Sequence, residues 1–143
     1  MVKIFTLIFV LFNLIRGILM KIDGEVTAGM GKAEFFLSQE FYTNEFKKNL
    51  GFIPFPGTLN VKVSEEHLDE INQIRDNCEN IIEPDEGFGA VKYVEAKING
   101  IIDGAIVFPA KTTHKINYLE VISEKKLRDE LNLNDGDIIS LEF

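Results

Sequence analysis

The chain has 143 residues, 45% of them hydrophobic and 27% charged, which suits one globular domain and excludes a disordered or fibrous protein. Its formal net charge of −8 makes nucleic acid a poor partner, because binding to nucleic acid depends on Lys and Arg side chains that neutralise phosphates. The single cysteine, Cys78, excludes an internal disulfide, and the two histidines, His67 and His114, are too far apart in sequence to show zinc-ligand spacing.

The first nineteen residues differ in composition from the rest of the chain. Ile4 to Leu19 is almost continuously apolar, but it contains Arg16, is shorter than the ~20 apolar residues of a transmembrane helix, and lacks the small-residue cleavage site of a signal peptide. Three interpretations stay open: a mis-assigned start or dispensable extension, a membrane anchor, and a signal sequence. We favour the first, because Met20 opens a natural first strand. Residues 1–19 are then a leader and 20–143 a cytoplasmic domain, with membrane association expected only if the leader is retained.

The N-terminal half of the domain predicts strands and one helix. Apolar and β-branched residues alternate with polar ones over Lys21–Ala28, which predicts a strand that ends at a glycine turn. The short apolar run Ala33–Leu37 predicts a second strand. Ser38–Leu50 has apolar residues at helical spacing before Gly51, a helix stop signal, and Thr58–Val63 alternates as a strand does.

The middle of the chain predicts a helix and a hairpin. Glu65–Asn80 is polar with apolar residues at helical spacing, and Ile81–Gly89 contains the Pro and Gly residues of a loop. Ala90–Ile98 and Ile101–Phe108 alternate as strands. Asn99-Gly100 between them is a strong signal for a two-residue hairpin turn.

The C-terminal region completes a mainly β pattern. Tyr118–Ile122 predicts a strand, Ser123–Leu131 a short helix, Asp135–Asp137 a turn, and Ile138–Phe143 the last strand. Six or seven short strands with two or three helices and no regular βαβ alternation favour a small β-barrel with peripheral helices.

Two motifs in the first half carry possible chemistry. Gly29-Met30-Gly31 follows a strand, and two glycines there let backbone N–H groups approach phosphate oxygens, although a plain tight turn has the same signature. Thr58 and Asn60 are two apart on a strand and present two neutral oxygens on one side, a donor set that suits Mg²⁺. The alternative is that Thr58 caps a turn while the Asn60 side chain bonds to the backbone.

Two further clusters lie in the second half. Asp103-Gly104 leads through a strand to Lys111-Thr112-Thr113-His114, which is either a pocket rim or an ordinary solvated loop. Ser123 to Arg128 opens the last predicted helix with three cations. A helix N-terminus attracts anions, but a solvated basic face has the same pattern.

The order of these motifs resembles the archaeal CTP-dependent riboflavin kinases from about Met20 to the C-terminus. The series is GEV, GMG, FF, FPGTLNV, DGAIVFP, KTTH, LEVI and KLRDELNLNDGD, of which PGTLN and DGAIV-x-P-x-x-T-x-H are specific. The resemblance implies a six-stranded cradle-loop β-barrel. It also implies transfer of the terminal phosphoryl group of CTP to riboflavin, giving FMN and CDP in a magnesium-dependent reaction of FMN biosynthesis.

The resemblance also implies roles for single residues. The metal ligands fall on Thr58 and Asn60, and the flavin contacts on Thr112 and Glu120. The nucleotide contacts fall on two stretches: Gly29, Met30, Gly31, Lys32, Ala33 and Glu34, and then Ser123, Glu124, Lys125, Lys126, Leu127 and Arg128. The family loop usually runs G-x-G-E-G, so the Lys-Ala-Glu that follows Gly31 is a departure.

Catalysis of phosphoryl transfer depends more on positioning and charge neutralisation than on covalent chemistry. Glu120 and Asp103 are the candidates for a general base, and neither is singled out by the sequence. The rival to an enzyme is a non-catalytic barrel module that binds a flavin or a nucleotide. The sequence gives no signal of oligomeric state.

Overall fold

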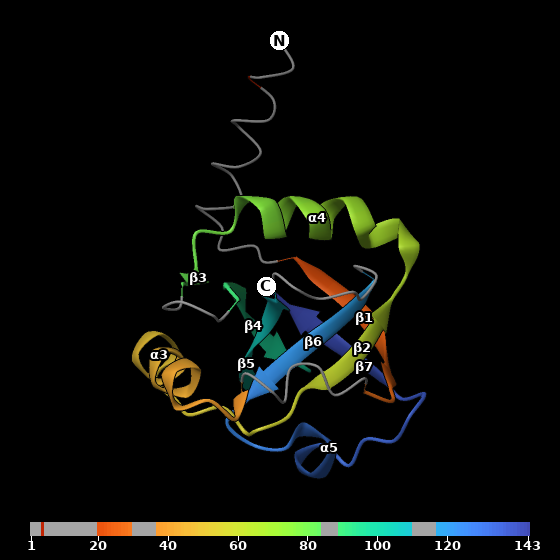
Figure 1. The fold of residues 1–143 in the computed structure, drawn as a ribbon. Helices are drawn as coiled ribbons and strands as arrows, with labels where there is room; N and C mark the ends of the chain where they lie inside the picture. Colours follow the sequence, from red (N-terminus) through yellow and green to blue (C-terminus); the bar gives the residue numbers. More distant parts are fainter. Residues whose placement is uncertain (1–3, 5–19, 30–36, 84–88, 110–116) are drawn as a thin grey trace.

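Seven strands and three α-helices form the part of the chain that the computed structural model describes, which is residue 4 and residues 20–29, 37–83, 89–109 and 117–143 (Figure 1). The strands are β1 Lys21–Thr27, β2 Leu59–Val63, β3 Ile81–Ile82, β4 Val91–Ile98, β5 Ile102–Pro109, β6 Tyr118–Ser123 and β7 Ile138–Glu142. The helices are α3 Glu40–Leu50, α4 Leu68–Asn77, which a 3-10 turn precedes at Glu65–His67, and α5 Leu127–Glu130.

Six strands close into an antiparallel barrel. The order is β4-β5-β6-β2-β1-β7, and β7 returns to β4 through the pairs Lys97↔Glu142 and Ile98↔Leu141. The short β3 pairs with the start of β4 at Ile82↔Val91. Closure removes the unpaired edges that an open sheet would expose. The mainly β, six-stranded barrel predicted from the sequence is therefore confirmed.

Alternation along the strands builds a core on each face of the barrel wall. Inward-facing residues such as Val26, Val61 and Val121 form the interior cluster. On the outside, α3 packs Tyr42 and Phe46 against the outer face of β4, β5 and β6. Figure 1 shows α3 beside the barrel, α4 across one end and α5 at the opposite end.

The turn residues have the backbone conformations that the sequence predicts. Asn99 and Gly100 have φ of 52° and 71°, the positive values that the two central residues of a type I′ hairpin turn require. Gly51 ends α3 in the left-handed conformation with φ of 84°. Gly136 has φ of 93° in the predicted turn before β7.

Three element predictions are wrong in extent. The helix predicted over Glu65–Asn80 is α4 at Leu68–Asn77, with a 3-10 turn at Glu65–His67 before it. The helix predicted over Ser123–Leu131 is only Leu127–Glu130, because Ser123 stays in β6. Its Oγ donates to the Asp103 carbonyl at 3.0 Å, and its own carbonyl accepts from the Phe55 N–H at 2.8 Å. The loop predicted over Ile81–Gly89 contains β3.

The strand predicted over Ala33–Leu37 lies outside the described residues except for Leu37, whose side chain is buried. Within the described part of the chain, no helix has both the length and the apolar character needed to cross a membrane.

Candidate functional site

A cavity of about 280 Å³ opens where the end of β1, the segment before β2 and the start of α5 meet. Its walls combine glycine backbone, neutral oxygens and cations. The lining residues are Gly29, Phe55, Gly57, Thr58, Leu59, Asn60, Lys126 and Arg128. The glycine motif, the Thr58–Asn60 pair and the basic cluster, which are distant in sequence, thus share one cavity.

A row of polar side chains crosses the outer face of the barrel beside this cavity. Asn60 on β2 is paired with Thr27 on β1 and with Glu120 on β6. Paired residues on antiparallel strands point to the same face. Because Leu59 and Val61 belong to the interior core, Asn60 and its two partners face outward.

The row is buried although it faces outward. Asn60 is 6% exposed and Glu120 is 3% exposed. The Thr58 hydroxyl, two residues before Asn60 and on the same face, donates to Glu120 Oε1 at 3.4 Å. Buried polar groups are costly unless they have partners, so this polar concentration is typical of a binding site and not of packing.

The donor set of the row suits a magnesium ion. Thr58 and Asn60 provide hard neutral oxygens next to the cavity, and Mg²⁺ bound by few protein ligands keeps positions for water and phosphate oxygens. The Thr27 hydroxyl oxygen in the same row is buried and has no hydrogen-bond partner among the described residues. A ligand-bound water or phosphate oxygen would satisfy it. Within the described ranges, no three His, Cys, Asp or Glu side chains gather into an alternative metal-binding group.

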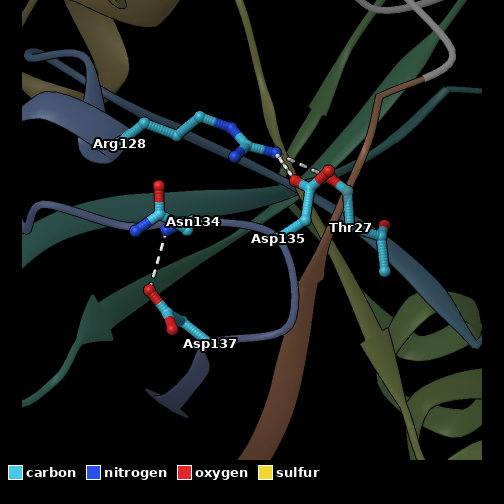
Figure 2. A network of polar contacts seen from close by, with 5 residues as sticks. All are labelled: Thr27, Arg128, Asn134, Asp135 and Asp137. Carbon is cyan, nitrogen blue, oxygen red and sulfur yellow. Dashed lines mark hydrogen bonds and ion pairs between the residues drawn. The ribbon is translucent and has the colours of Figure 1, made fainter.

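The cations reach the cavity from the start of α5. Lys126 is exposed and immediately precedes the helix. Arg128 Nη2 donates to the Thr27 carbonyl at 3.0 Å and to Asp135 Oδ1 at 2.6 Å (Figure 2). A helix of four residues has little macrodipole, so the predicted attraction of an anion to a helix N-terminus is replaced by attraction to these two side chains.

The other residues of the basic stretch lie apart from the cavity. Ser123 is 2% exposed and bonded to the backbone, and the Leu127 side chain belongs to the interior core. Glu124 is exposed, and Lys125 forms an exposed ion pair with Glu130 at 3.6 Å. Met30, Gly31, Lys32, Ala33 and Glu34, together with Thr112, lie outside the described residues.

Asp103 lies at a second, larger cavity of about 660 Å³. This cavity has apolar walls from Phe52 and Phe143 and charged groups from Glu95, Lys97, Asp103 and Glu142. Of the two predicted candidates for a general base, the structure therefore brings Glu120, and not the Asp103 side chain, into contact with the Thr58–Asn60 site.

Three residues of the site were not predicted. Phe55 lines the cavity, Thr27 belongs to the polar row, and Asp135 binds Arg128. Gly57, which also lines the cavity, is part of the motif PGTLN on which the family resemblance rests. The contact of Asp135 depends on how the turn before β7 meets β1, which no local pattern encodes.

One family model and several riboflavin kinases match most of this chain. A family model described as "CTP-dep_RFKase: Domain of unknown function DUF120" matches residues 26–143. A riboflavin kinase of Methanobrevibacter smithii is 66% identical over 124 residues, which cover 87% of this chain and 100% of the relative. Riboflavin kinases of Methanothermobacter thermautotrophicus and Sulfurisphaera tokodaii are 41% and 42% identical, over 81% and 87% of this chain and 93% and 95% of the relatives.

Proposed function

We propose that this chain, which belongs to the CTP-dependent riboflavin kinase family and is a riboflavin kinase, transfers the terminal phosphoryl group of CTP to the 5'-hydroxyl of riboflavin and releases FMN and CDP. The observation that carries the donor side of this proposal is the cavity that joins Gly29, the Thr58–Asn60 pair and two cations. Its charge and its neutral oxygens suit a metal-bound polyphosphate.

Thr58 and Asn60 are the proposed ligands of a magnesium ion, which when bound would neutralise charge on the donor phosphates. The Thr58 hydroxyl also donates to Glu120, and this contact orients the hydroxyl. Because β2 is paired on both sides, by β1 and β6, Asn60 is held on a rigid element, and Thr58 directly precedes this strand. Rigid placement of charge-stabilising groups is the main contribution a protein makes to phosphoryl transfer.

Lys126 and Arg128 are proposed to neutralise the remaining phosphate charge, and the backbone that begins at Gly29 is proposed to approach the phosphates closely. The Leu127 side chain is buried in the core, so any contact of Leu127 with the nucleotide would use its backbone.

Glu120 and Thr112 are proposed to orient riboflavin. Glu120 is next to Asn60 in the register and contacts Thr58, so a hydroxyl bound to its carboxylate would lie near the donor phosphates. Of the two candidates for a general base, Glu120 is the better placed. A loose transition state needs little assistance from a base, so we propose orientation as the main role of Glu120.

The test is FMN formation from riboflavin with CTP, ATP, GTP or UTP, each with and without Mg²⁺. The proposal expects FMN with CTP and Mg²⁺ and much less FMN with the other donors or without the metal. Equal use of ATP would contradict the donor assignment. Binding of flavin or nucleotide without any FMN would instead favour the alternative, a non-catalytic binding module.

We also propose that residues 20–143 are the working domain, in the cytoplasm, and that residues 1–19 are dispensable for the reaction. The family match begins at residue 26, which supports this division. Deletion of residues 1–19 is expected to leave kcat and both KM values within about twofold of the full chain, since the family match lies wholly outside these residues. A large loss of activity in the deletion variant would overturn this assignment.

A further inference from the structure

Asp135 makes a contact that turn formation does not require. The carboxylate lies in the turn before β7, and its Oδ1 accepts a hydrogen bond from Arg128 Nη2 at 2.6 Å (Figure 2). The two side chains are 60% and 33% exposed. Exposed ion pairs contribute little to stability, so stability alone is a weak reason for this contact.

The turn that carries Asp135 is fixed to the end of β1. The Gly136 N–H donates to the Val26 carbonyl at 2.8 Å, and the Val26 N–H donates to the Asp137 carbonyl at 2.8 Å. Within the turn, the Asn134 N–H donates to Asp137 Oδ2 at 2.7 Å (Figure 2). Asp135 is therefore held by backbone bonds to the strand that leads directly to Gly29.

Arg128 is held at two points by a single nitrogen. Nη2 has two hydrogens, and its two bonds go to Asp135 and to the Thr27 carbonyl. The N–H groups of Nε and Nη1 make no hydrogen bond to any described residue, and Arg128 lines the cavity with Gly29 and Asn60. A guanidinium fixed through one nitrogen can present its other N–H groups to a phosphate without losing side-chain freedom on binding.

We propose that Asp135 is a positioning residue for the nucleotide donor, which acts by holding Arg128 against the end of β1 at the rim of the cavity. This inference rests on the proposed function of the cavity as the donor site. In this role, Asp135 itself makes no contact with the phosphates. In this role, Asp135 favours binding of an anion although it is itself an anion.

The charge of Asp135 alone and its proposed positioning role predict opposite changes in the KM for CTP. If Asp135 acted only through its charge, Asp135→Asn would remove a negative charge near the donor phosphates and lower the KM for CTP. If Asp135 positions Arg128, the same variant frees the guanidinium and raises the KM for CTP. We expect a rise of about tenfold, with the KM for riboflavin unchanged, because misplaced binding groups commonly cost factors of this size or more.

Two further variants separate positioning from charge and from folding. Asp129→Asn removes the same charge from an exposed residue next to Arg128 that has no described side-chain contact, and it should leave the KM for CTP unchanged or slightly lower. Asp135→Glu keeps the carboxylate and should restore most of the affinity. The melting temperature of each variant without ligand, measured in parallel, reports any loss of folding.

The deciding measurement is a double-mutant cycle with Arg128→Ala, read as the KM for CTP and as the equilibrium affinity for CDP. If Asp135 acts through Arg128, Asp135→Asn should have no further effect in the Arg128→Ala background. The inference is overturned if Asp135→Asn lowers or does not change the KM for CTP, if its effect persists without Arg128, or if both KM values change together with the melting temperature.

The wild-type enzyme distinguishes failure of this inference from failure of the proposed function. If the wild type uses CTP and Asp135→Asn behaves like it, only the role of Asp135 is wrong. If the wild type uses another nucleoside triphosphate, the donor assignment is wrong, and the same variants are then compared by the KM for that donor and the affinity for its diphosphate.

Discussion

Two cavities among the described residues differ in the charge of their lining, and the larger of them is the less suitable for a polyphosphate. The larger cavity, of about 660 Å³, has three carboxylates and one lysine among its lining residues: Glu95, Asp103, Glu142 and Lys97. The smaller cavity, of about 280 Å³, is lined by Lys126 and Arg128 and by no carboxylate of the described residues. A polyphosphate is repelled by the first set of charges and attracted by the second.

The charge and the metal-ligand atoms of a cavity, and not its volume, decide which of the two cavities is the candidate phosphate site. Neutral oxygens at Thr58 and Asn60 can share a metal with phosphates without adding negative charge, whereas a set of carboxylates would compete with the phosphates for it. Of these two cavities, the smaller one is lined by Asn60 of the polar row on β1, β2 and β6, and the larger one is lined by none of the described residues of that row. Substitutions at the two cavities should therefore differ in their effects on FMN formation.

The largest effect is expected from removing both neutral oxygens. The Thr58→Ala/Asn60→Ala double variant should lose more than about 10²-fold in kcat/KM, the scale of losing one preorganised electrostatic group. Its fold should remain intact, because neither side chain belongs to the interior core. Steady-state FMN formation measures the loss, and Glu95→Gln in the larger cavity is the control with near wild-type activity. Unchanged kinetics in the double variant would refute the metal assignment.

A smaller loss is expected from Glu120. Glu120→Gln should lower kcat/KM for riboflavin by about tenfold, because a hydrogen bond to a charged group commonly contributes about 1.5 kcal/mol or more. Asp103→Asn should change it much less, since the Asp103 side chain lies at the larger cavity. Riboflavin titrations of the two variants at saturating CTP measure the difference. A larger effect of Asp103→Asn would reverse our order of the two candidates.

A change in the wall of the larger cavity should affect stability and not affinity. A Cβ on Gly104 would overlap the Ile122 carbonyl oxygen and lie 2.8 Å from Ile98 Cδ1. Gly104→Ala should therefore lower the free energy of unfolding by about 1–3 kcal/mol, as overpacking does. Urea denaturation measures it. The KM for CTP of the folded variant should match the wild type, and a selective change in that KM would show that this wall contributes to the donor site.

The smallest effect is expected from a single exposed lysine. Lys126→Ala should raise the KM for CTP by about two- to fivefold, and the effect should shrink as salt increases, because the interactions of exposed charges are weak and screened. Lys125→Ala should have a smaller effect, since Lys125 pairs with Glu130 and does not line the cavity. CTP titrations at two ionic strengths compare the two lysines, and equal effects would argue against a specific role for Lys126.

Local signals predicted the fold well. Asn99-Gly100 specified its hairpin because only a few residues accept two successive positive φ angles. Gly51 ended its helix because glycine accepts the single positive φ of a helix C-terminus. The predicted helix over Ser123–Leu131 was too long because tertiary bonds extend β6 through Ser123. Helical spacing alone cannot report such bonds.

The site was predicted in part. Thr58 and Asn60 were found because strand alternation places residues two apart on one face, and the register confirms that Asn60 faces outward. Their metal-binding role stays a prediction. The burial of Glu120 and the link from Arg128 to Asp135 depend on which strands become neighbours, and the sequence has no periodicity that carries this information.

A crystal structure of the protein with CDP and Mn²⁺ in place of Mg²⁺ tests the central claim most directly, because the anomalous signal of manganese locates the metal. We predict a peak at bonding distance from Thr58 Oγ1 and Asn60 Oδ1, with the CDP phosphates between Gly29 and the side chains of Lys126 and Arg128. A peak at the carboxylates of the larger cavity, or CDP bound away from β2, would contradict it.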